Sequence, residues 1–304
     1  MIDLRDTAPG TRSSVMVRTN TGPVTEVPLT VIRGAAEGPT LLVTAGVHGA
    51  EYASIEAALR LGQLDPAALS GTLVLLPLVN HPAFAARSIY INPLDGKNLN
   101  RVFPGDPQGT FAEQLADWLT TGFVQQADAW IDLHGGDMNE ALTPFVIHRR
   151  GDEPSRQLAS EFGISYVVSS ASEGSSYSVG QQLGIPAIIA EASGQGVFNE
   201  PEITILVDGV KRVMQARGML EGTPFDFTPV FLDSFNVLKS AHDGFWYLDA
   251  AMGQQVRAGD VLGEIRNFLG EPLEQITAPV DGVVLYAVAS LAINSGDPLV
   301  GIGH

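Results

Sequence analysis

The feature that most constrains the fold is an alternation, up to about residue 220, of short apolar runs with amphipathic helical patterns. Six runs are typical of β-strands: TLLVTAG, TLVLLPLV, AWIDL, PFVIH, YVVSS and PAIIAE. Two further segments, one between these runs and one after the last of them, predict helices with one apolar face, carried by Phe111, Leu115, Trp118 and Leu119 in the first and by Ile203, Leu206, Val210 and Val213 in the second. Alternating elements of this kind predict a layered α/β domain, and the nearly continuous apolar runs predict a sheet buried on both faces.

After GTPFDFTP at 222–229 the pattern changes to short strands separated by Gly, Asp and Pro turns. We therefore expect an α/β domain over residues 1–225 and a small all-β domain over 226–304. The phrases VRAGDVLGEI, ITAPVDGVV and INSGDPLVGI resemble the barrel-sandwich fold of biotinyl and lipoyl carrier domains. Such a carrier needs a lysine at an exposed hairpin tip, and no lysine lies between residues 256 and 286. The fold is therefore expected without the carrier function.

Composition excludes several function classes. The chain has 304 residues and a formal net charge of −17, which opposes binding to nucleic acid or to an anionic membrane surface. It contains no cysteine, so a transition metal would have to be held by His, Asp or Glu. The sequence shows neither a signal-peptide pattern nor an apolar run of the roughly 20 residues that span a bilayer, so a cytoplasmic protein is expected.

The stretch TAGVHGAEYAS, at 44–54, places His48 and Glu51 where an apolar strand gives way to a helix. Side chains at positions i and i+3 of a first helical turn project from one face, so the two could bind one ion. Loops at the carboxyl ends of strands are also where α/β sheets hold ligands. The alternative is an ordinary histidine beside a glutamate that complements the helix dipole.

A catalytic zinc site needs a third protein ligand and an open fourth position. His134 is one candidate, because it directly follows the apolar run AWIDL and precedes two glycines. The rival is His148, which precedes Arg149 and Arg150, and those charges disfavour a nearby cation. An ordinary loop histidine is the alternative reading of His134.

Two further segments suggest substrate chemistry. In DGKNLNRVFPG, at 95–105, Arg101 could bind a carboxylate through its planar fork and Asn100 could hold a second oxygen, although a surface ion pair is the alternative for Arg101. Glu191 emerges from PAIIA, where partial burial raises a carboxyl pKa and suits it to proton transfer. Capping of the following loop is its alternative role.

With HGAE, NLNR, DLHGG and AEASGQG in this order, residues 35–220 resemble the succinylglutamate desuccinylase and aspartoacylase family, relatives of the zinc carboxypeptidases. The resemblance implies a zinc-carboxypeptidase-like layered domain with a mixed central sheet. It implies one zinc ion per chain, held by His48, Glu51 and His134. It further implies a substrate-carboxylate site at Asn100 and Arg101, and Glu191 as the general base and acid.

The chain departs from the family pattern at one position. Family members often carry an arginine shortly before the Asn-Arg loop that polarises the scissile carbonyl, but RSIYINPLDG has Tyr90 near that place and Arg87 earlier. Arg87 is included as a substrate-binding candidate from a shifted position.

The sequence as a whole predicts a zinc-dependent hydrolase that cleaves the amide bond of a small, carboxylate-bearing N-acyl amino acid. A metallocarboxypeptidase for short peptides and a non-catalytic binding protein with the same fold are the alternatives. The acyl group and the amino acid do not follow from the sequence, which is also compatible with a homo-oligomer.

Overall fold

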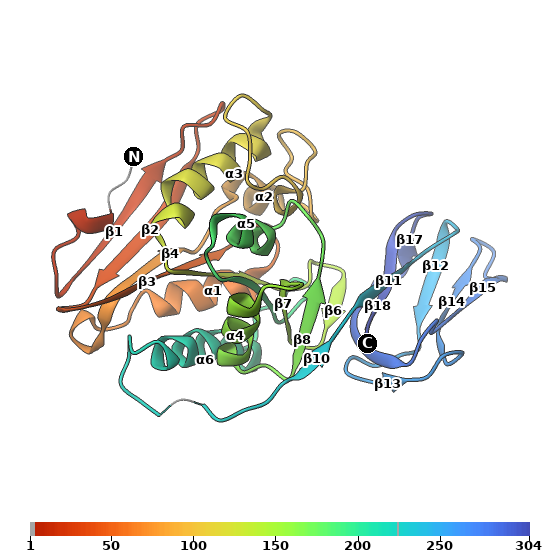
Figure 1. The fold of residues 1–304 in the computed structure, drawn as a ribbon. Helices are drawn as coiled ribbons and strands as arrows, with labels where there is room; N and C mark the ends of the chain where they lie inside the picture. Colours follow the sequence, from red (N-terminus) through yellow and green to blue (C-terminus); the bar gives the residue numbers. More distant parts are fainter. Residues whose placement is uncertain (1–3, 224) are drawn as a thin grey trace.

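The computed structural model describes residues 4–223 and 225–304, which form a large α/β unit and a smaller β unit at one end of it (Figure 1). A nine-stranded mixed sheet runs through the large unit in the order β1-β2-β4-β3-β5-β9-β7-β8-β10. Its strands are β1 (Thr11–Arg18), β2 (Glu26–Arg33), β3 (Ala36–Ala45), β4 (Ser70–Leu76), β5 (Ala129–His134), β7 (Phe145–Arg149), β8 (Tyr166–Ser170), β9 (Ala187–Glu191) and β10 (Val230–Leu232).

Strands β3, β4, β5 and β9 are mutually parallel, whereas β7 runs antiparallel to β9. The carboxyl ends of β3, β5 and β9 therefore meet at one edge of the sheet. The adjoining ends bring together the loops that follow Ala45, His134 and Glu191.

Helices cover both faces of this sheet. One core packs α1 (Tyr52–Leu61), α4 (Glu153–Phe162) and α6 (Glu200–Ala216) against alternate residues of the central strands, such as Leu41 and Val43. The other packs α3 (Phe111–Gly122) and α5 (Ser176–Leu183) against the intervening residues, such as Leu42 and Trp130. The strands read as continuous apolar runs because each of their faces is buried in its own core.

The smaller unit consists of short antiparallel strands in two sheets. One has the order β11-β18-β16-β13 and the other β15-β14-β12-β17. Their bounds are β11 (Phe235–Lys239), β12 (Gly244–Leu248), β13 (Gln255–Val256), β14 (Val261–Arg266), β15 (Pro272–Thr277), β16 (Gly282–Val288), β17 (Ala292–Ile293) and β18 (Pro298–Gly303). Inward side chains of both sheets, among them Trp246, Leu262 and Val300, form its core.

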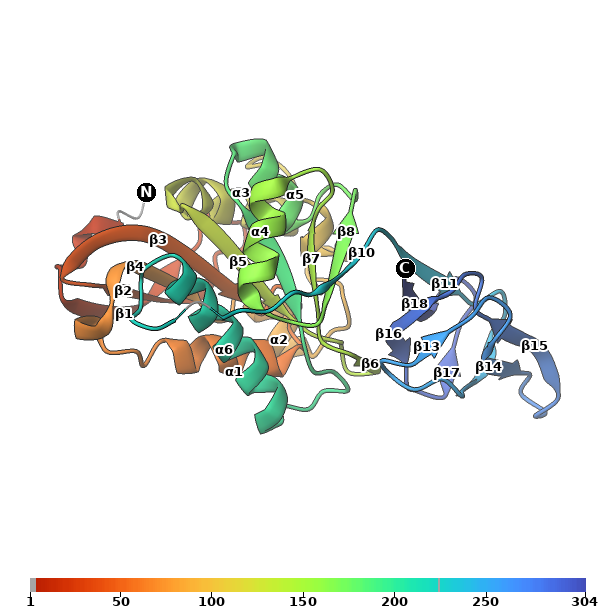
Figure 2. The same ribbon diagram turned by 60° about the horizontal axis from the view of Figure 1, so that its bottom comes forward.

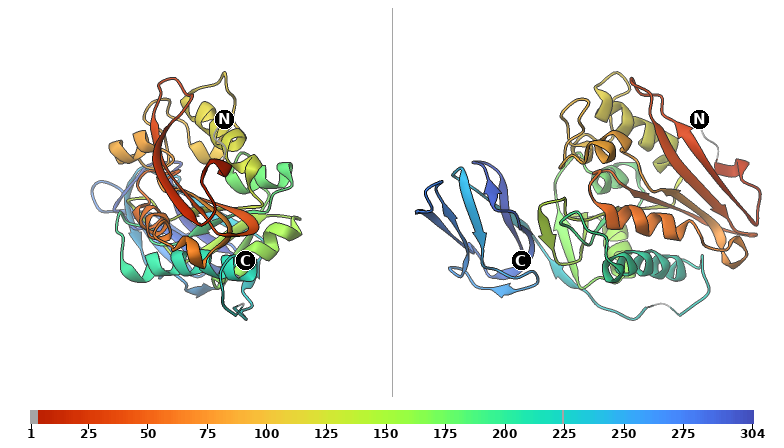
Figure 3. Two further views of the ribbon diagram at one scale, coloured as in Figure 1. Left: turned by 90° about the vertical axis from the view of Figure 1, so that its left-hand side faces the viewer. Right: turned by 180° about the vertical axis from the view of Figure 1, so that it is seen from behind.

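The two units are joined by more than the connecting chain. Strand β6 (Glu140–Leu142) leaves the large unit and pairs antiparallel with β16, so that it belongs to a sheet of the smaller unit (Figure 2). A small apolar cluster at the junction contains Phe145 and Val168 from one unit and Val283 and Leu285 from the other. Strand β1 lies at the opposite end of the molecule from the smaller unit (Figure 3).

All six strands and both helices expected from the sequence are present, which confirms a mixed α/β fold with a large mixed sheet followed by antiparallel β-structure. The carboxypeptidase-like layering and the barrel-sandwich description stay predictions. The expected division at 225/226 also stays a prediction, and sheet membership changes between Leu232 and Phe235. Across the described ranges, no helix combines the length and the apolar character that crossing a membrane requires.

Candidate metal centre and active-site cavity

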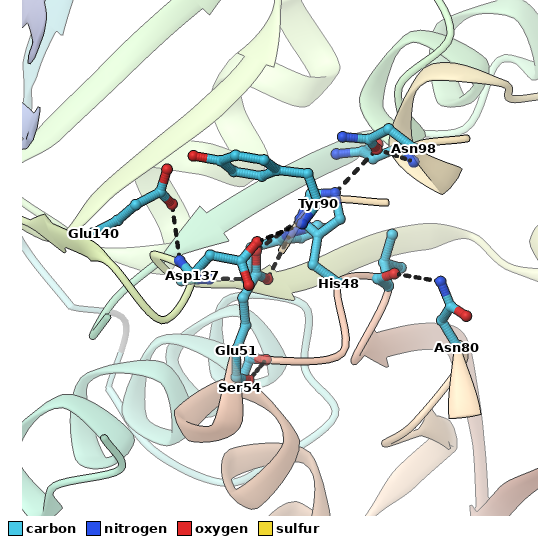
Figure 4. A network of polar contacts seen from close by, with 12 residues as sticks. His48, Glu51, Ser54, Asn80, Tyr90, Asn98, Asp137 and Glu140 are labelled. Carbon is cyan, nitrogen blue, oxygen red and sulfur yellow. Dashed lines mark hydrogen bonds and ion pairs between the residues drawn. The ribbon is translucent and has the colours of Figure 1, made fainter. Parts of the chain in front are cut away.

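Three predicted ligands converge at the carboxyl ends of β3 and β5. His48 lies in the loop after β3, Glu51 immediately precedes α1, and His134 is the last residue of β5. Nδ1 of His48 is 2.7 Å from Oε1 of Glu51, and Nδ1 of His134 is 2.9 Å from Oε2 of the same carboxylate. Although Glu51 occupies the N-cap position, its side chain does not cap the helix. Its carboxylate instead faces His48 (Figure 4) and also contacts the imidazole of His134.

The electrostatics of this group follow from burial and from the opposed charges. Burial by itself would raise the pKa of Glu51, but the two histidines lower it to about 2. Burial would likewise lower the pKa of His134, whereas Asp132 and Glu51 raise it well above its ordinary value. In the absence of a metal, Glu51 therefore stays ionised, and the imidazoles of His48 and His134 bind protons more readily than free histidine does.

The outer nitrogens of both imidazoles have partners of their own. Nε2 of His134 lies 2.9 Å from Oδ2 of Asp132, and Oδ1 of this fully buried aspartate accepts a 2.6 Å hydrogen bond from the Thr44 hydroxyl. Nε2 of His48 lies 3.0 Å from Oδ1 of Asn98. Such partners orient metal-binding histidines and fix which nitrogen faces the ion. Here Nδ1 of each histidine is the nitrogen available for a metal.

The donor set fits a single ion. One ligand atom from each of His48, Glu51 and His134 lies within 4.8 Å of the others, and all three side chains are buried. Two nitrogens and one carboxylate that leave further positions open are the ligands of catalytic zinc sites. The geometry is compatible with one metal ion.

Glu191 ends β9 and is the register partner of His134 in the adjacent parallel strand. Its Oε2 is buried without a hydrogen-bond partner. Burial raises the pKa of Glu191 to about 8, because the charge of His134 offsets only part of the cost of desolvation. A carboxyl with this environment can take and return protons near neutral pH.

A cavity of about 830 Å³ opens onto the cluster and runs along the junction of the two units. His48, Glu51 and Glu191 line it on the side of the large unit, and Phe235 and Tyr286 line it on the side of the smaller one. The smaller unit therefore forms one wall of the candidate active site.

The family comparison agrees with this geometry. Residues 37–217 match the model of the succinylglutamate desuccinylase/aspartoacylase catalytic domain. The chain belongs to this family. It is 30% identical over 290 residues to the N-alpha-acetyl-L-2,4-diaminobutyric acid deacetylase of Halomonas elongata, covering 90% of this chain and 84% of that enzyme.

Solved structures of related proteins extend the match to both units. The succinylglutamate desuccinylase/aspartoacylase of Rhodobacter sphaeroides superposes with a TM-score of 0.87 at 27% identity, covering 100% of this chain and 97% of that one. The product-bound ectoine utilization protein EutE (DoeB) of Ruegeria pomeroyi gives a TM-score of 0.87 at 26% identity, with 98% and 97% covered.

In this member of the family, the predicted Asn-Arg pair is divided between two environments. Arg101 is exposed and lines the cavity, and none of the ion pairs among the described residues involves it. Asn100 is buried, and its Oδ1 accepts a 3.0 Å hydrogen bond from the backbone of Ser176 at the start of α5. The backbone oxygen of Asn100 also accepts a 2.7 Å bond from Nη1 of Arg101.

The remaining candidates are not among the described residues that line the cavity. Arg87 follows α2 (His81–Ala86) in the left-handed region at φ 53°, is exposed, and is not among the described residues that line the cavity. His148 is buried within β7 and is also outside this lining. The roles of Asn100 and Arg87 in substrate binding stay predictions.

Several residues around the cluster were not predicted from the sequence. Asn98 and Asp132 contact the ligand imidazoles, Asp137 and Glu140 follow His134 closely, and Tyr286 donates a hydrogen bond to Glu140. Asp137 and Glu140 lie within DLHGGDMNE, a few residues after His134. Acidic residues so close to a predicted metal ligand were the sequence feature that could have identified them. Tyr286 carried no signal, because it looks like any other residue of an apolar strand.

Proposed function

We propose that the protein is a zinc-dependent amidohydrolase that removes the acyl group from a small N-acylated amino acid. The main support is that Glu191 and the His48–Glu51–His134 cluster adjoin the same cavity. One carboxyl oxygen of Glu191 is buried there without a hydrogen-bond partner. Membership of the family and the deacetylase activity named for the Halomonas relative support it.

The chain's own residues divide the work between them. Glu191 takes a proton from the attacking water and returns it to the leaving amine, which its raised pKa permits. Arg101 binds the substrate carboxylate through its guanidinium fork, held in place by the backbone of Asn100. Asp132 and Asn98 fix the ligand imidazoles. A zinc ion held by His48, Glu51 and His134 would supply a Lewis acid and lower the pKa of water at the site to about 7.

The metallocarboxypeptidase alternative uses the same groups but needs an open groove for a peptide. The wall that Phe235 and Tyr286 of the smaller unit contribute favours small substrates instead. A binding protein that merely keeps the fold would not need a base beside the metal ligands, and Glu191 is in place. We further propose a cytoplasmic location and a small-molecule substrate without nucleic-acid or membrane partners, as the charge of the chain favours.

The test combines metal analysis with a substrate screen. Purified protein loaded with zinc is assayed on N-acetyl, N-succinyl and N-formyl amino acids and on short peptides with a free carboxyl end. N-acetylated diamino acids come first, given the Halomonas relative. Release of the free amino acid with one zinc per chain supports the proposal. Cleavage of peptides alone would favour the carboxypeptidase, and metal binding without any hydrolysis would favour the binding protein.

A further inference from the structure

One side chain of the smaller unit reaches a buried carboxylate of the large unit. The hydroxyl of Tyr286, on β16, donates a 2.6 Å hydrogen bond to Oε1 of Glu140. Glu140 is 4% exposed and is the first residue of β6, the strand that pairs with β16. Burial and the charge of Glu140 raise the pKa of Tyr286, so its hydroxyl keeps its proton and remains a donor.

Glu140 in turn holds the two loops that follow the catalytic strands. Its Oε2 accepts a 2.8 Å hydrogen bond from the backbone N–H of Asp137, in the loop after His134. Its backbone oxygen accepts a 2.8 Å bond from the N–H of Gln195, in the loop after Glu191. The Tyr286–Glu140 contact therefore links the smaller unit to both loops.

The same network ends at Tyr90, whose ring lies beside the candidate metal site. The backbone N–H of Tyr90 donates a 2.9 Å bond to Oδ2 of Asp137, which holds the residue in the left-handed region at φ 58° (Figure 4). Its ring meets the imidazole of His48 edge-on, with the ring centroids 6.3 Å apart. A bulky residue with positive φ is uncommon and clusters at functional sites.

The hydroxyls of Tyr90 and Tyr286 are 3.3 Å apart. Each phenol carries one proton, and that of Tyr286 is used in the short bond to Glu140. Any bond between the two phenols must therefore be donated by Tyr90. At 3.3 Å it is longer than the usual O–H···O range and hence weak, so the Tyr90 proton can be redirected to a ligand in the cavity at little cost.

We propose that Tyr286 and Glu140 act as a positioning pair that holds Tyr90 over the metal site, with the Tyr90 hydroxyl donating a hydrogen bond to the bound substrate. Tyr90 and Tyr286 both line the cavity, so the substrate meets residues of both units. The smaller unit is thereby part of the catalytic apparatus and not only a wall. The inference rests on the proposed function for the identity of the substrate.

A double-mutant cycle tests the pair. Tyr286→Phe removes one hydroxyl and should lower kcat about 5- to 50-fold, with KM within about twofold and the bound metal retained. Tyr90→Phe should lower kcat at least as much. If Tyr286 acts through Tyr90, the double variant should match Tyr90→Phe alone. Multiplying losses in kcat, or a Tyr90→Phe enzyme with wild-type kcat, would overturn the proposal.

A matched control and a second variant separate positioning from general damage. Tyr247→Phe, on β12 and 40% exposed, should leave kcat unchanged. Glu140→Gln keeps the volume of the side chain but weakens both of its side-chain hydrogen bonds. It should lower kcat in the wild-type background and have no further effect on kcat in the Tyr90→Phe background. If Tyr286→Phe fails to fold, this second cycle decides the matter by the same criterion.

Hydrogen exchange gives a readout that needs no substrate. In Tyr286→Phe, the amides of Asp137 and Gln195, which bond to Glu140, should exchange faster than in the wild type, and in Tyr247→Phe they should not. Unchanged exchange in Tyr286→Phe would contradict the pair even if the enzyme proves active. A wild type that hydrolyses no N-acyl amino acid would instead contradict the proposed function and leave this exchange result standing.

Discussion

Glu191 and His134 are register partners at the carboxyl ends of two adjacent parallel strands, β9 and β5. In such a pair both side chains leave the sheet at the same edge, which places a carboxyl beside a metal-ligand candidate without any contribution from flexible loops. The position depends on the register of two buried strands. Rigid elements of this kind hold catalytic groups more precisely than loops do.

Replacing Glu191 by Gln should separate catalysis from binding. The amide keeps the size of the side chain but cannot take a proton, so kcat should fall roughly 10²- to 10⁴-fold while zinc and substrate affinity remain. Steady-state kinetics and metal analysis of the purified variant measure both quantities. Near wild-type turnover would refute the role as base, and loss of zinc would make Glu191 a ligand instead.

The central strands and the candidate site residues at their ends were predictable, because strands buried on both faces have nearly continuous apolar sequences. TLLV and AWIDL each contain a single polar residue and PAIIA contains none, as expected of strands covered on both faces, and a polar residue directly follows each run at the sheet edge. His48, His134 and Glu191 could therefore be placed at one edge before their distances were known. The hairpin of β1 and β2 was not expected, since most β1 side chains are exposed and show no apolar face.

Side-chain direction within short turns was not predictable. Asn98, Asn100 and Arg101 lie within four residues of each other, yet Asn98 bonds to His48, Asn100 bonds to the start of α5, and Arg101 faces the cavity. The sequence pattern paired Asn100 with Arg101 as two substrate-binding side chains. The short helix η3 (Leu99–Arg101) instead sends successive side chains in different directions. The bond between Glu140 and Tyr286 joins residues 146 positions apart, and no local pattern encodes such a pair.

Metal binding should depend on His134 and not on His148. His134→Ala removes one of two nitrogen ligands and should abolish stoichiometric zinc, as measured by metal analysis after dialysis. His148→Ala is the matched control, because His148 is buried in β7 outside the cavity lining, and this variant should keep its zinc. The opposite pattern would identify His148 as the third ligand.

Arg101 should recognise the carboxylate of the substrate. Arg101→Lys keeps the charge but loses the planar fork, so kcat/KM should fall roughly tenfold to a hundredfold. The same enzyme forms are then assayed on a substrate and on its carboxamide analogue, which lacks the negative charge. Equal wild-type activity on the two compounds would remove the reason for assigning Arg101 this role.

The stability of the metal-free protein should fall as pH rises. Asp132 and Glu51 outweigh burial and raise the pKa of His134 well above 6.5, so the folded state binds a proton that the unfolded state has already released. The stabilisation is complete below the unfolded pKa and is lost as pH increases through the folded pKa. Zinc competes for the same nitrogen, so its stabilising effect should grow over that range as the proton leaves. Urea unfolding from about pH 6 to about pH 9, with chelator or with excess zinc, measures both trends.

His134→Gln, which has no titrating group at this position, should show a flatter profile of stability against pH in chelator. A chelated wild type that gains stability steadily across the range would contradict the charge assignment of the cluster.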